Sequence, residues 1–315
     1  MRSLLLVLLC ATCCSASQQD NIETLMDNIV IVHMNSNQGS KVRLTCGDAY
    51  QNVPVFWKRN GMELQQPLLG NQVEVLVEEM VGGNYSCHLS RNGEYLNHTV
   101  ILIQLGPNNR TVILEETSPE EGHIHCSAFN YEGSFHCSWT RSQLRSRAPV
   151  LLVKAERFNE TISCELDADG SGVRCQDANC SHNEEQHRIK LTLYIHSFSR
   201  LEVYTKSFYL RDIVKPEKLP NLRMSQGKVF SWDHPPSWSQ PCTYFSLQYQ
   251  VKVVRSGQEC TSEEHIMTED TDQTMHEVKV KTNRFVFCVR ARDKYTTGQW
   301  SVWNQCTVNK DSVSC

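Results

Sequence analysis

Cysteine is the residue type with the greatest capacity for chemistry in this chain. The 315 residues include fifteen cysteines, and three of them, Cys10, Cys13 and Cys14, lie close to the amino terminus. In an oxidising compartment the other twelve, fifteen minus three, pair into disulfides by default. The chemistry we expect is therefore covalent cross-linking, and a thiol without a partner in its own chain suits a bond to another chain.

The amino terminus places the protein in such a compartment. A basic residue precedes the apolar run 4–10, and the small residues Ser15 and Ser17 stand where a signal peptidase cleaves. We expect residues 1–17 to be removed as a signal peptide, and the mature chain to be secreted and extracellular. No later stretch approaches the roughly 18 to 20 apolar residues that cross a bilayer, so no membrane span is expected.

Metal binding and catalysis are weaker alternatives. Cys175, Cys180, His182 and His187 have the residue types of a tetrahedral zinc site, but secretion favours a disulfide for Cys175. The sequence has no Gly-x-Ser-x-Gly elbow, no His-Glu-x-x-His motif and no phosphate-binding glycine loop. A formal net charge of -4 gives no basic face for nucleic acid. We therefore expect a binding protein without metal or cofactor, and not an enzyme.

The chain carries several acceptor motifs for N-linked glycans. Five Asn-X-Ser/Thr sequons begin at Asn84, Asn97, Asn109, Asn159 and Asn179. Such motifs are glycosylated on the surface of secreted proteins. We expect glycans on the first four of these asparagines.

The first domain has the spacing of an immunoglobulin sandwich. Cys46, Trp57 and Cys87 follow a Cys–Trp–Cys pattern, and Tyr85 stands two residues before the second cysteine, as in a tyrosine corner. A Cys46–Cys87 bridge would stabilise the domain by roughly 3 to 4 kcal/mol in the chain-entropy model. We expect an immunoglobulin-like domain over residues 18–106.

Two further β-sandwiches are expected downstream. A turn-rich joint leads into the second domain, residues 107–216, where Cys126 and Cys137 suit a bridge between adjacent strands. The connector 215–222 holds two prolines, which stiffen the backbone ahead of the third domain, residues 217–315. The predicted fold is all-β, with three tandem β-sandwich domains.

The third domain contains residues suited to a stacked ladder. Arg290 and Arg292 are two apart on a predicted strand and so project from one face, and Trp300 and Trp303 follow after a turn. Guanidinium groups between indoles gain roughly 0.5 to 2 kcal/mol each from cation–π contacts. We expect this ladder to make the domain rigid.

The second and third domains together resemble the haematopoietic cytokine-receptor module, in which two fibronectin type III-like domains meet at an elbow. The string Cys126-x10-Cys137-Ser-Trp139 is similar to the amino-terminal signature of that module. Cys164 and Cys175, with the turn Asp-Gly-Ser-Gly between them, look like its second disulfide.

The order of the domains narrows the resemblance. Trp300-Ser-Val-Trp303 is similar to the Trp-Ser-x-Trp-Ser motif of cytokine receptors, although Asn304 replaces its last serine. An immunoglobulin domain followed by this module resembles the family of soluble, receptor-like beta subunits of the interleukin-12 and interleukin-23 type. The strings 131–137 and 208–216 support the resemblance.

This family implies a function. The chain would be the secreted beta subunit of a heterodimeric cytokine that signals through cell-surface cytokine receptors in immune regulation. The elbow would bind a four-helix-bundle alpha subunit, and a disulfide would link the two chains. Two alternatives stay open, namely a free-standing soluble receptor alpha chain that binds reversibly, and a homodimeric decoy.

The family assigns the interchain disulfide to Cys180. We expect the third domain to form two bridges of its own, Cys242–Cys288 and Cys260–Cys306. Cysteine arithmetic then leaves Cys180 and Cys315 without partners. A glycan on Asn179 would stand beside the thiol of Cys180, so we expect that sequon to be largely unoccupied.

The family assigns the noncovalent contact to Tyr131 in the second domain and to Tyr244 and Asp293 in the third. These positions would form a pocket for an arginine of the helical partner. A carboxylate pairs with a guanidinium in bidentate geometry, while flanking phenols exclude water and stack on its plane. Anchors of this kind contribute roughly 2 to 4 kcal/mol each to binding.

Overall fold

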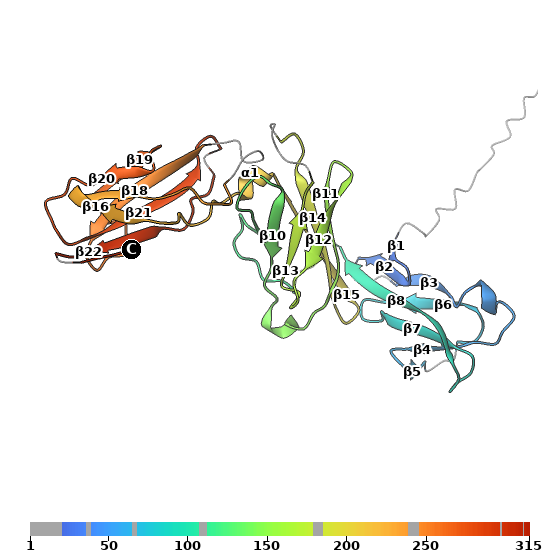
Figure 1. The fold of residues 1–315 in the computed structure, drawn as a ribbon. Coiled ribbons are helices and arrows are strands. Elements are labelled where there is room, and N and C mark those ends of the chain that lie inside the picture. Colours follow the sequence, from blue (N-terminus) through green and yellow to red (C-terminus); the bar gives the residue numbers. More distant parts are fainter. Residues whose placement is uncertain are drawn as a thin grey trace, which may run out of the picture. The chain divides into compact units, whose positions relative to one another are not determined.

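The computed structural model describes residues 21–35, 39–64, 68–106, 112–178, 185–238, 246–296, 298–310 and 312–315 (Figure 1). Some expectations fall outside these ranges: the signal peptide, the sequons Asn109 and Asn179, and Cys180, Cys242 and Tyr244.

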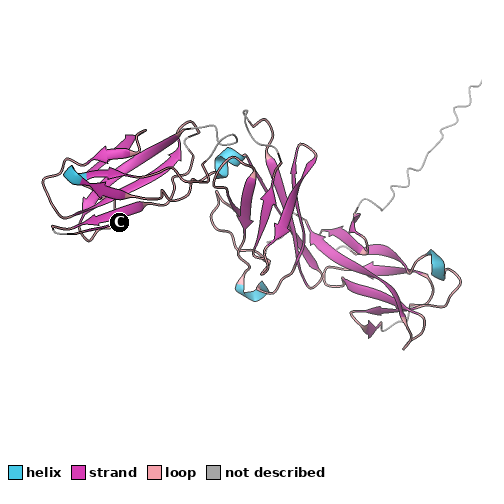
Figure 2. Cartoon of the chain, in the orientation of Figure 1, coloured by secondary structure: helices cyan, strands magenta, loops and turns pink. Residues whose placement is uncertain are grey.

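The fold is all-β, as the sequence predicts (Figure 2). Among the described residues the only α-helix is α1 (Leu210–Ile213). The chain divides into two compact units, one formed by residues 1–111 with 196–202 and the other by residues 112–195 with 203–315. The first unit holds one large hydrophobic core and the second holds two, so the structure is a series of β-sandwiches.

The first unit is a sandwich of two sheets. Its strands are β1 (Ile22–Met26), β2 (Ile29–Met34), β3 (Ser40–Thr45), β4 (Phe56–Arg59), β5 (Met62–Glu63), β6 (Gln72–Val77), β7 (Gly83–His88) and β8 (Tyr95–Leu105). One sheet has the order β1-β2-β8-β7-β4-β5, and the other pairs β3 with β6. Buried and exposed residues alternate along β3 and β6, so every second side chain enters the core.

The core of this unit contains the residues of the expected immunoglobulin pattern. Cys46 and Cys87 form a disulfide with their Cα atoms 6.0 Å apart, and Trp57 is buried with them. The indole Nε1 of Trp57 donates to the carbonyl of Gly70 at 3.0 Å. The hydroxyl of Tyr85 donates to the carbonyl of Val81 at 3.1 Å, which is the hydrogen bond of a tyrosine corner.

The second unit begins with a sandwich that carries two cross-strand disulfides. Its strands are β9 (His125–Ser127), β10 (Ser134–Ser138), β11 (Val150–Arg157), β12 (Glu160–Leu166), β13 (Gly172–Gln176), β14 (Ile189–Ser197) and β15 (Arg200–Phe208). Cys126 lies directly opposite Cys137 across β9 and β10, and Cys164 lies directly opposite Cys175 across β12 and β13. Both pairs are disulfides, the same pairs that the sequence analysis names.

The last sandwich has a three-stranded and a five-stranded sheet. Its strands are β16 (Arg223–Ser225), β17 (Val229–Ser231), β18 (Leu247–Arg255), β19 (Met267–Thr271), β20 (Met275–Glu277), β21 (Phe285–Asp293), β22 (Asn304–Val308) and β23 (Val313–Ser314). Phe230 stacks on Phe287 with ring centroids 3.9 Å apart, and Trp232 meets Tyr249 edge to face. These rings lie in the core between the two sheets.

The disulfides of this sandwich differ from the expected ones. The structure forms Cys260–Cys288 and Cys306–Cys315 in place of Cys242–Cys288 and Cys260–Cys306. Cys306 lies opposite Phe287 and faces the core, whereas Cys288, the next residue along β21, faces the other side of the sheet with Cys260. Because neighbouring strand residues point to opposite faces, Cys260 and Cys306 are separated by the sheet. Strand β23 pairs with β22 and brings Cys315 to Cys306.

The ladder residues stack in one column on the outer face of β21. The guanidinium of Arg290 lies 4.7 Å from the ring centre of Trp300 and 4.3 Å from that of Trp303, and Arg292 lies 4.3 Å from Trp300. Burial lowers the pKa of Arg290. Side-chain oxygens of β18 hold both guanidiniums, because Gln250 accepts from Arg290 and Gln248 from Arg292. The substituted position also has a role, since Asn304 donates to the carbonyl of Leu219 at 2.7 Å.

Peptide mapping of the unreduced protein tests the revised disulfides. We expect linked peptides that join Cys260 to Cys288 and Cys306 to Cys315, because the strand register places each pair on one face of the sheet. Peptides that join Cys260 to Cys306 would contradict this register.

Candidate partner-binding site

The loop that carries Tyr131 is fixed at both ends. It connects β9 to β10. At its start, Ala128 donates to the carbonyl of Ile213 at 3.0 Å and accepts from the amide of Lys215 at 2.7 Å. At its end, Gly133 has φ +89° and accepts from the amide of Asp177 at 2.9 Å. A Cβ on Gly133 would come 2.1 Å from the carbonyl oxygen of Asp177, so this approach requires glycine.

Asp293 ends strand β21 and orders the loop that follows. Its Oδ1 accepts from the backbone amide of Tyr295 at 2.7 Å and from that of Thr296 at 3.1 Å. A side chain that binds amides two and three residues ahead fixes a turn in the backbone. Asp293 therefore has one oxygen committed to its own loop and the other directed elsewhere.

The structure brings Tyr131 and Asp293 together. The phenol of Tyr131 donates to Oδ2 of Asp293 at 2.8 Å, and the two side chains are 2% and 1% exposed. The ring of Trp238 meets the ring of Tyr131 edge to face with centroids 5.9 Å apart, and Trp238 packs against both hydrophobic cores of the second unit. Nearby, the side-chain amide of Asn130 donates to the carbonyl of Ser237 at 2.6 Å. This joint connects the two sandwiches of the second unit.

The hydrogen bond at the joint requires Tyr131 to be protonated and Asp293 to be charged. Burial is the main cause that raises the pKa of Tyr131, and the negative charge of Asp293 acts in the same direction. The phenol thus stays protonated and donates to a carboxylate, which is the stronger class of hydrogen bond. In this arrangement a partner guanidinium would have to share Oδ2 of Asp293 with Tyr131. The third expected residue, Tyr244, lies outside the described residues.

Two exposed aromatic residues flank the joint, and neither was predicted from the sequence as a partner-binding residue. Phe129 stands two residues before Tyr131 and is 60% exposed, and Tyr295 stands two residues after Asp293 and is 67% exposed. In each loop an exposed aromatic residue thus stands two positions from a buried polar residue. Large exposed rings beside a buried polar pair are typical of the centre and rim of protein interfaces. The spacing Phe129-x-Tyr131 is visible in the sequence, but the exposure of Phe129 is not.

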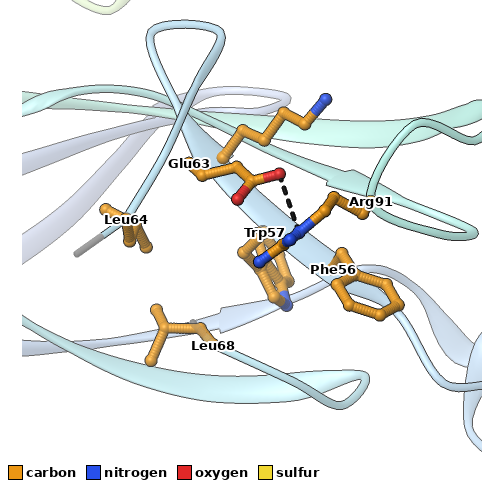
Figure 3. Close-up of a pocket in the computed structure, with 7 residues that line it drawn as sticks. Phe56, Trp57, Glu63, Leu64, Leu68 and Arg91 are labelled. Atoms are coloured by element: carbon orange, nitrogen blue, oxygen red, sulfur yellow. Dashed lines mark ion pairs between the residues drawn. The ribbon is translucent and has the colours of Figure 1, made fainter. Parts of the chain in front are cut away.

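The first unit contains a separate pocket between β4, β5 and the segments beyond them (Figure 3). Apolar side chains form most of its lining, and Arg91 Nε pairs with Glu63 Oε1 at 3.1 Å across it. The pocket is small, with a cavity volume of about 30 Å³, and it is open to solvent. Its lining has no nucleophile paired with a base, so the pocket offers contact surface and no evident reaction.

The candidate glycosylation sites within the described residues differ in exposure. Asn84 and Asn159 are exposed, and Asn159 sits in a tight turn with φ +66°. Asn97 is half-buried, and its Nδ2 donates to the carbonyl of Cys46 at 3.2 Å.

The zinc site considered in the sequence analysis is not formed by its described residues. Cys175 is in a disulfide, and the ring of His187 stacks on that of Phe158. The described part of the chain contains no group of three or more residues suited to a metal. Nor does that part contain a helix long and apolar enough to cross a membrane.

Known proteins are similar to this chain over most of its length. A family model described as cytokine interleukin-12p40 C-terminus matches residues 121–197. Interleukin-12 subunit beta of Marmota monax is 29% identical over 309 residues, which are 89% of this chain and 90% of that protein. The protein of the same name from Homo sapiens is 29% identical over 293 residues, or 84% and 85%, and that from Felis catus is 28% identical over 328 residues, 92% of each chain. The names of these relatives are those of a cytokine subunit, which agrees with the prediction of a binding protein.

Removal of the Tyr131 hydroxyl tests the joint. Tyr131→Phe leaves Oδ2 of Asp293 buried without its donor, so we expect the free energy of unfolding of the second unit to fall by about 1.5 to 3 kcal/mol. Tyr85→Phe in the first unit removes the same atom from a neutral acceptor and should cost only about 1 kcal/mol. Denaturant unfolding measures both. Equal losses would mean that the carboxylate gives the bond no added strength.

The stability of the second unit should also fall in strong alkali. The pKa of Tyr131 in the folded chain lies above its ordinary value of 10.0, so above that pH the unfolded chain releases a proton that the folded chain retains. The stabilisation is complete below pH 10 and declines as the pH rises beyond it. Tyr131→Phe should lessen this slope, leaving the part contributed by Tyr249, whose pKa is also raised by burial. An unchanged slope would contradict the assignment.

Proposed function

We propose that this chain acts as the secreted beta subunit of a two-chain cytokine, because it is similar to interleukin-12 subunit beta over most of its length. In this proposal the loops at the joint between the two sandwiches of the second unit bind a four-helix-bundle alpha subunit. The assembled cytokine then signals through cell-surface cytokine receptors. The immunoglobulin-like domain, for which we retain the bounds 18–106, contributes a receptor contact.

The observation that carries the proposal is the buried contact between Tyr131 and Asp293. The two residues are 162 positions apart in the sequence, yet they form one hydrogen bond at a joint between two sandwiches. The family assigns both to partner binding, and their proximity supports this assignment. Phe129 and Tyr295 add exposed aromatic surface on either side, which suits the broad contact that a helical bundle offers.

A guanidinium of the alpha subunit would complement the carboxylate of Asp293, and it would reach this carboxylate by displacing the side chains that cover it, because Asp293 is 1% exposed. One lone pair of Asp293 Oδ2 accepts from Tyr131, and an oxygen of a carboxylate has capacity for a second donor. The rings of Phe129 and Tyr295 would then cover the new ion pair and exclude water. Burial of this kind makes a single arginine contribute a large share of the binding energy.

The proposed covalent link uses Cys180. Among the described residues five disulfides use ten of the twelve cysteines that follow the expected signal peptide, and the other two, Cys180 and Cys242, lie outside the described residues. Cys315, which the sequence analysis left unpaired, is bound to Cys306. Cys180 could thus bond to the alpha subunit, to a second copy of this chain or to Cys242 of its own chain. Glycans on Asn84 and Asn159 suit their exposure, whereas Asn97 would have to keep its hydrogen bond to Cys46.

Co-secretion tests the function and the link together. The tagged chain is expressed with the four-helix alpha subunit of the same organism, as the parent, as Cys180→Ser and as the matched variant Cys242→Ser. On nonreducing gels we expect a disulfide-linked heterodimer from the parent and from Cys242→Ser, and only a reversible complex from Cys180→Ser.

Other results would favour one of the alternative functions or exclude the interchain disulfide. A monomer that binds reversibly, with Cys180→Ser equal to the parent, would favour a soluble receptor chain. A peptide map that joins Cys180 to Cys242 would exclude the interchain bond. A linked homodimer without the alpha subunit would favour a decoy.

A further inference from the structure

A buried charged cluster lies in the same sandwich as Tyr131, and it takes no part in the Tyr131–Asp293 hydrogen bond itself. Arg157, the last residue of β11, has its Nη2 3.0 Å from Oδ2 of Asp177 and 3.1 Å from Oε1 of Glu185. The side chains of both acids are 3% exposed and that of Arg157 is 11% exposed. The guanidinium thus donates a hydrogen bond to Glu185 and forms an ion pair with Asp177.

Glu185 extends the cluster to the backbone of α1. Its Oε1 accepts from the amide of Leu210 at 2.8 Å and its Oε2 from the amide of Arg211 at 3.0 Å. The side chain of Arg211 reaches back to the carbonyl of Glu185 at 3.3 Å. Arg157 is therefore linked, through Glu185, to the first turn of α1.

The other end of α1 holds the start of the Tyr131 loop. Ala128 is bonded to Ile213 and to Lys215, which follow the turn that Glu185 fixes. Asp177, the second carboxylate on Arg157, donates its amide to Gly133 at the end of the same loop, and Gln176 donates to Glu132 at 3.0 Å. Both ends of the loop are thus attached to segments whose carboxylates, Glu185 and Asp177, contact the guanidinium of Arg157.

We propose that Arg157 is a positioning residue for partner binding: it fixes, through Asp177 and Glu185, the two ends of the loop that presents Phe129 and Tyr131. Its consequence for binding rests on the proposed function. Arg157 does not touch the partner. It acts by keeping the phenol of Tyr131 within hydrogen-bond distance of Asp293 before the partner arrives, so that less ordering is needed on binding.

The chemistry of the cluster favours arginine. Two carboxylates buried near each other repel and lose hydration, and the guanidinium offsets both effects by placing one nitrogen, Nη2, 3.0 Å from Asp177 and 3.1 Å from Glu185. Lysine keeps the charge, but its side chain is one bond shorter, so its ammonium does not reach the position of Nη2. Arg157→Lys therefore loosens the two attachments without removing the positive charge.

Arg141 supplies a matched control in the same sandwich. Its guanidinium donates to the carbonyls of Ala148 and Gly170, both at 2.8 Å. Strand register places that clamp at the opposite end of β10, because Ser138 pairs with Gly172 whereas Ser134, next to the Tyr131 loop, pairs with Gln176. Arg141→Lys makes the same chemical change far from the loop.

Hydrogen exchange of the free chain tests the positioning directly. With Arg157→Lys we expect amides of residues 129–133 to exchange at least about tenfold faster, and with Arg141→Lys we expect a change of less than about twofold there. Equal exchange in parent and Arg157→Lys, or the same acceleration in both variants, would overturn the proposal. If Arg157→Lys is not secreted, Asp177→Asn and Glu185→Gln each release one end of the loop and are measured in the same way.

The affinity for the alpha subunit tests the consequence. It is measured in a Cys180→Ser background, so that the covalent link does not mask it. We expect Arg157→Lys to weaken the complex by at least about tenfold and Arg141→Lys to change it by less than about threefold. Faster loop exchange with unchanged affinity would remove the role in binding. Failure of the Cys180→Ser chain itself to bind the alpha subunit would refute the proposed function, while the exchange data would still decide whether Arg157 holds the loop.

Discussion

The hydrogen bond from Tyr131 to Asp293 joins loops from two different sandwiches, and it is buried with almost no access to solvent. A buried carboxylate is costly unless its oxygens have donors, and here each oxygen has at least one, two of the donors being backbone amides. The requirement to satisfy Asp293 therefore constrains the β9–β10 loop, the turn after β21 and the packing of Trp238. The same constraint creates the surface that we assign to the partner, because the loops that bury the pair also expose Phe129 and Tyr295.

The supporting structure on the two sides of this bond is built differently. On the side of Asp293, cross-strand register, two disulfides and the stacked Arg–Trp column make the sandwich rigid. On the side of Tyr131, the two disulfides lie within strand pairs, and the loop itself depends on the cluster around Arg157. The loop that carries the phenol is thus held by backbone hydrogen bonds to segments that the charged cluster joins, and the turn that carries the carboxylate follows a strand held by disulfides and stacking contacts.

The sequence predicted what depends on local spacing. The pair Cys46 and Cys87, the tyrosine corner and the all-β class follow from short patterns whose physical meaning is local. The pairing of Cys260 was wrong because it depends on which face of β21 each cysteine occupies, and one residue of register decides that. Arg157, Asp177 and Glu185 were not identified either, since their contacts join three segments that no short motif links. Phe129 was missed because its importance arises only from its exposure beside a buried pair.

The most direct test of the account is a hydrogen-exchange footprint of the chain, free and bound to its alpha subunit. The account predicts that binding protects residues 128–133 and 293–296, the two loops that the Tyr131–Asp293 hydrogen bond joins, and leaves the pocket of the first unit unchanged. Protection confined to the first unit, with no change in either loop, would contradict it.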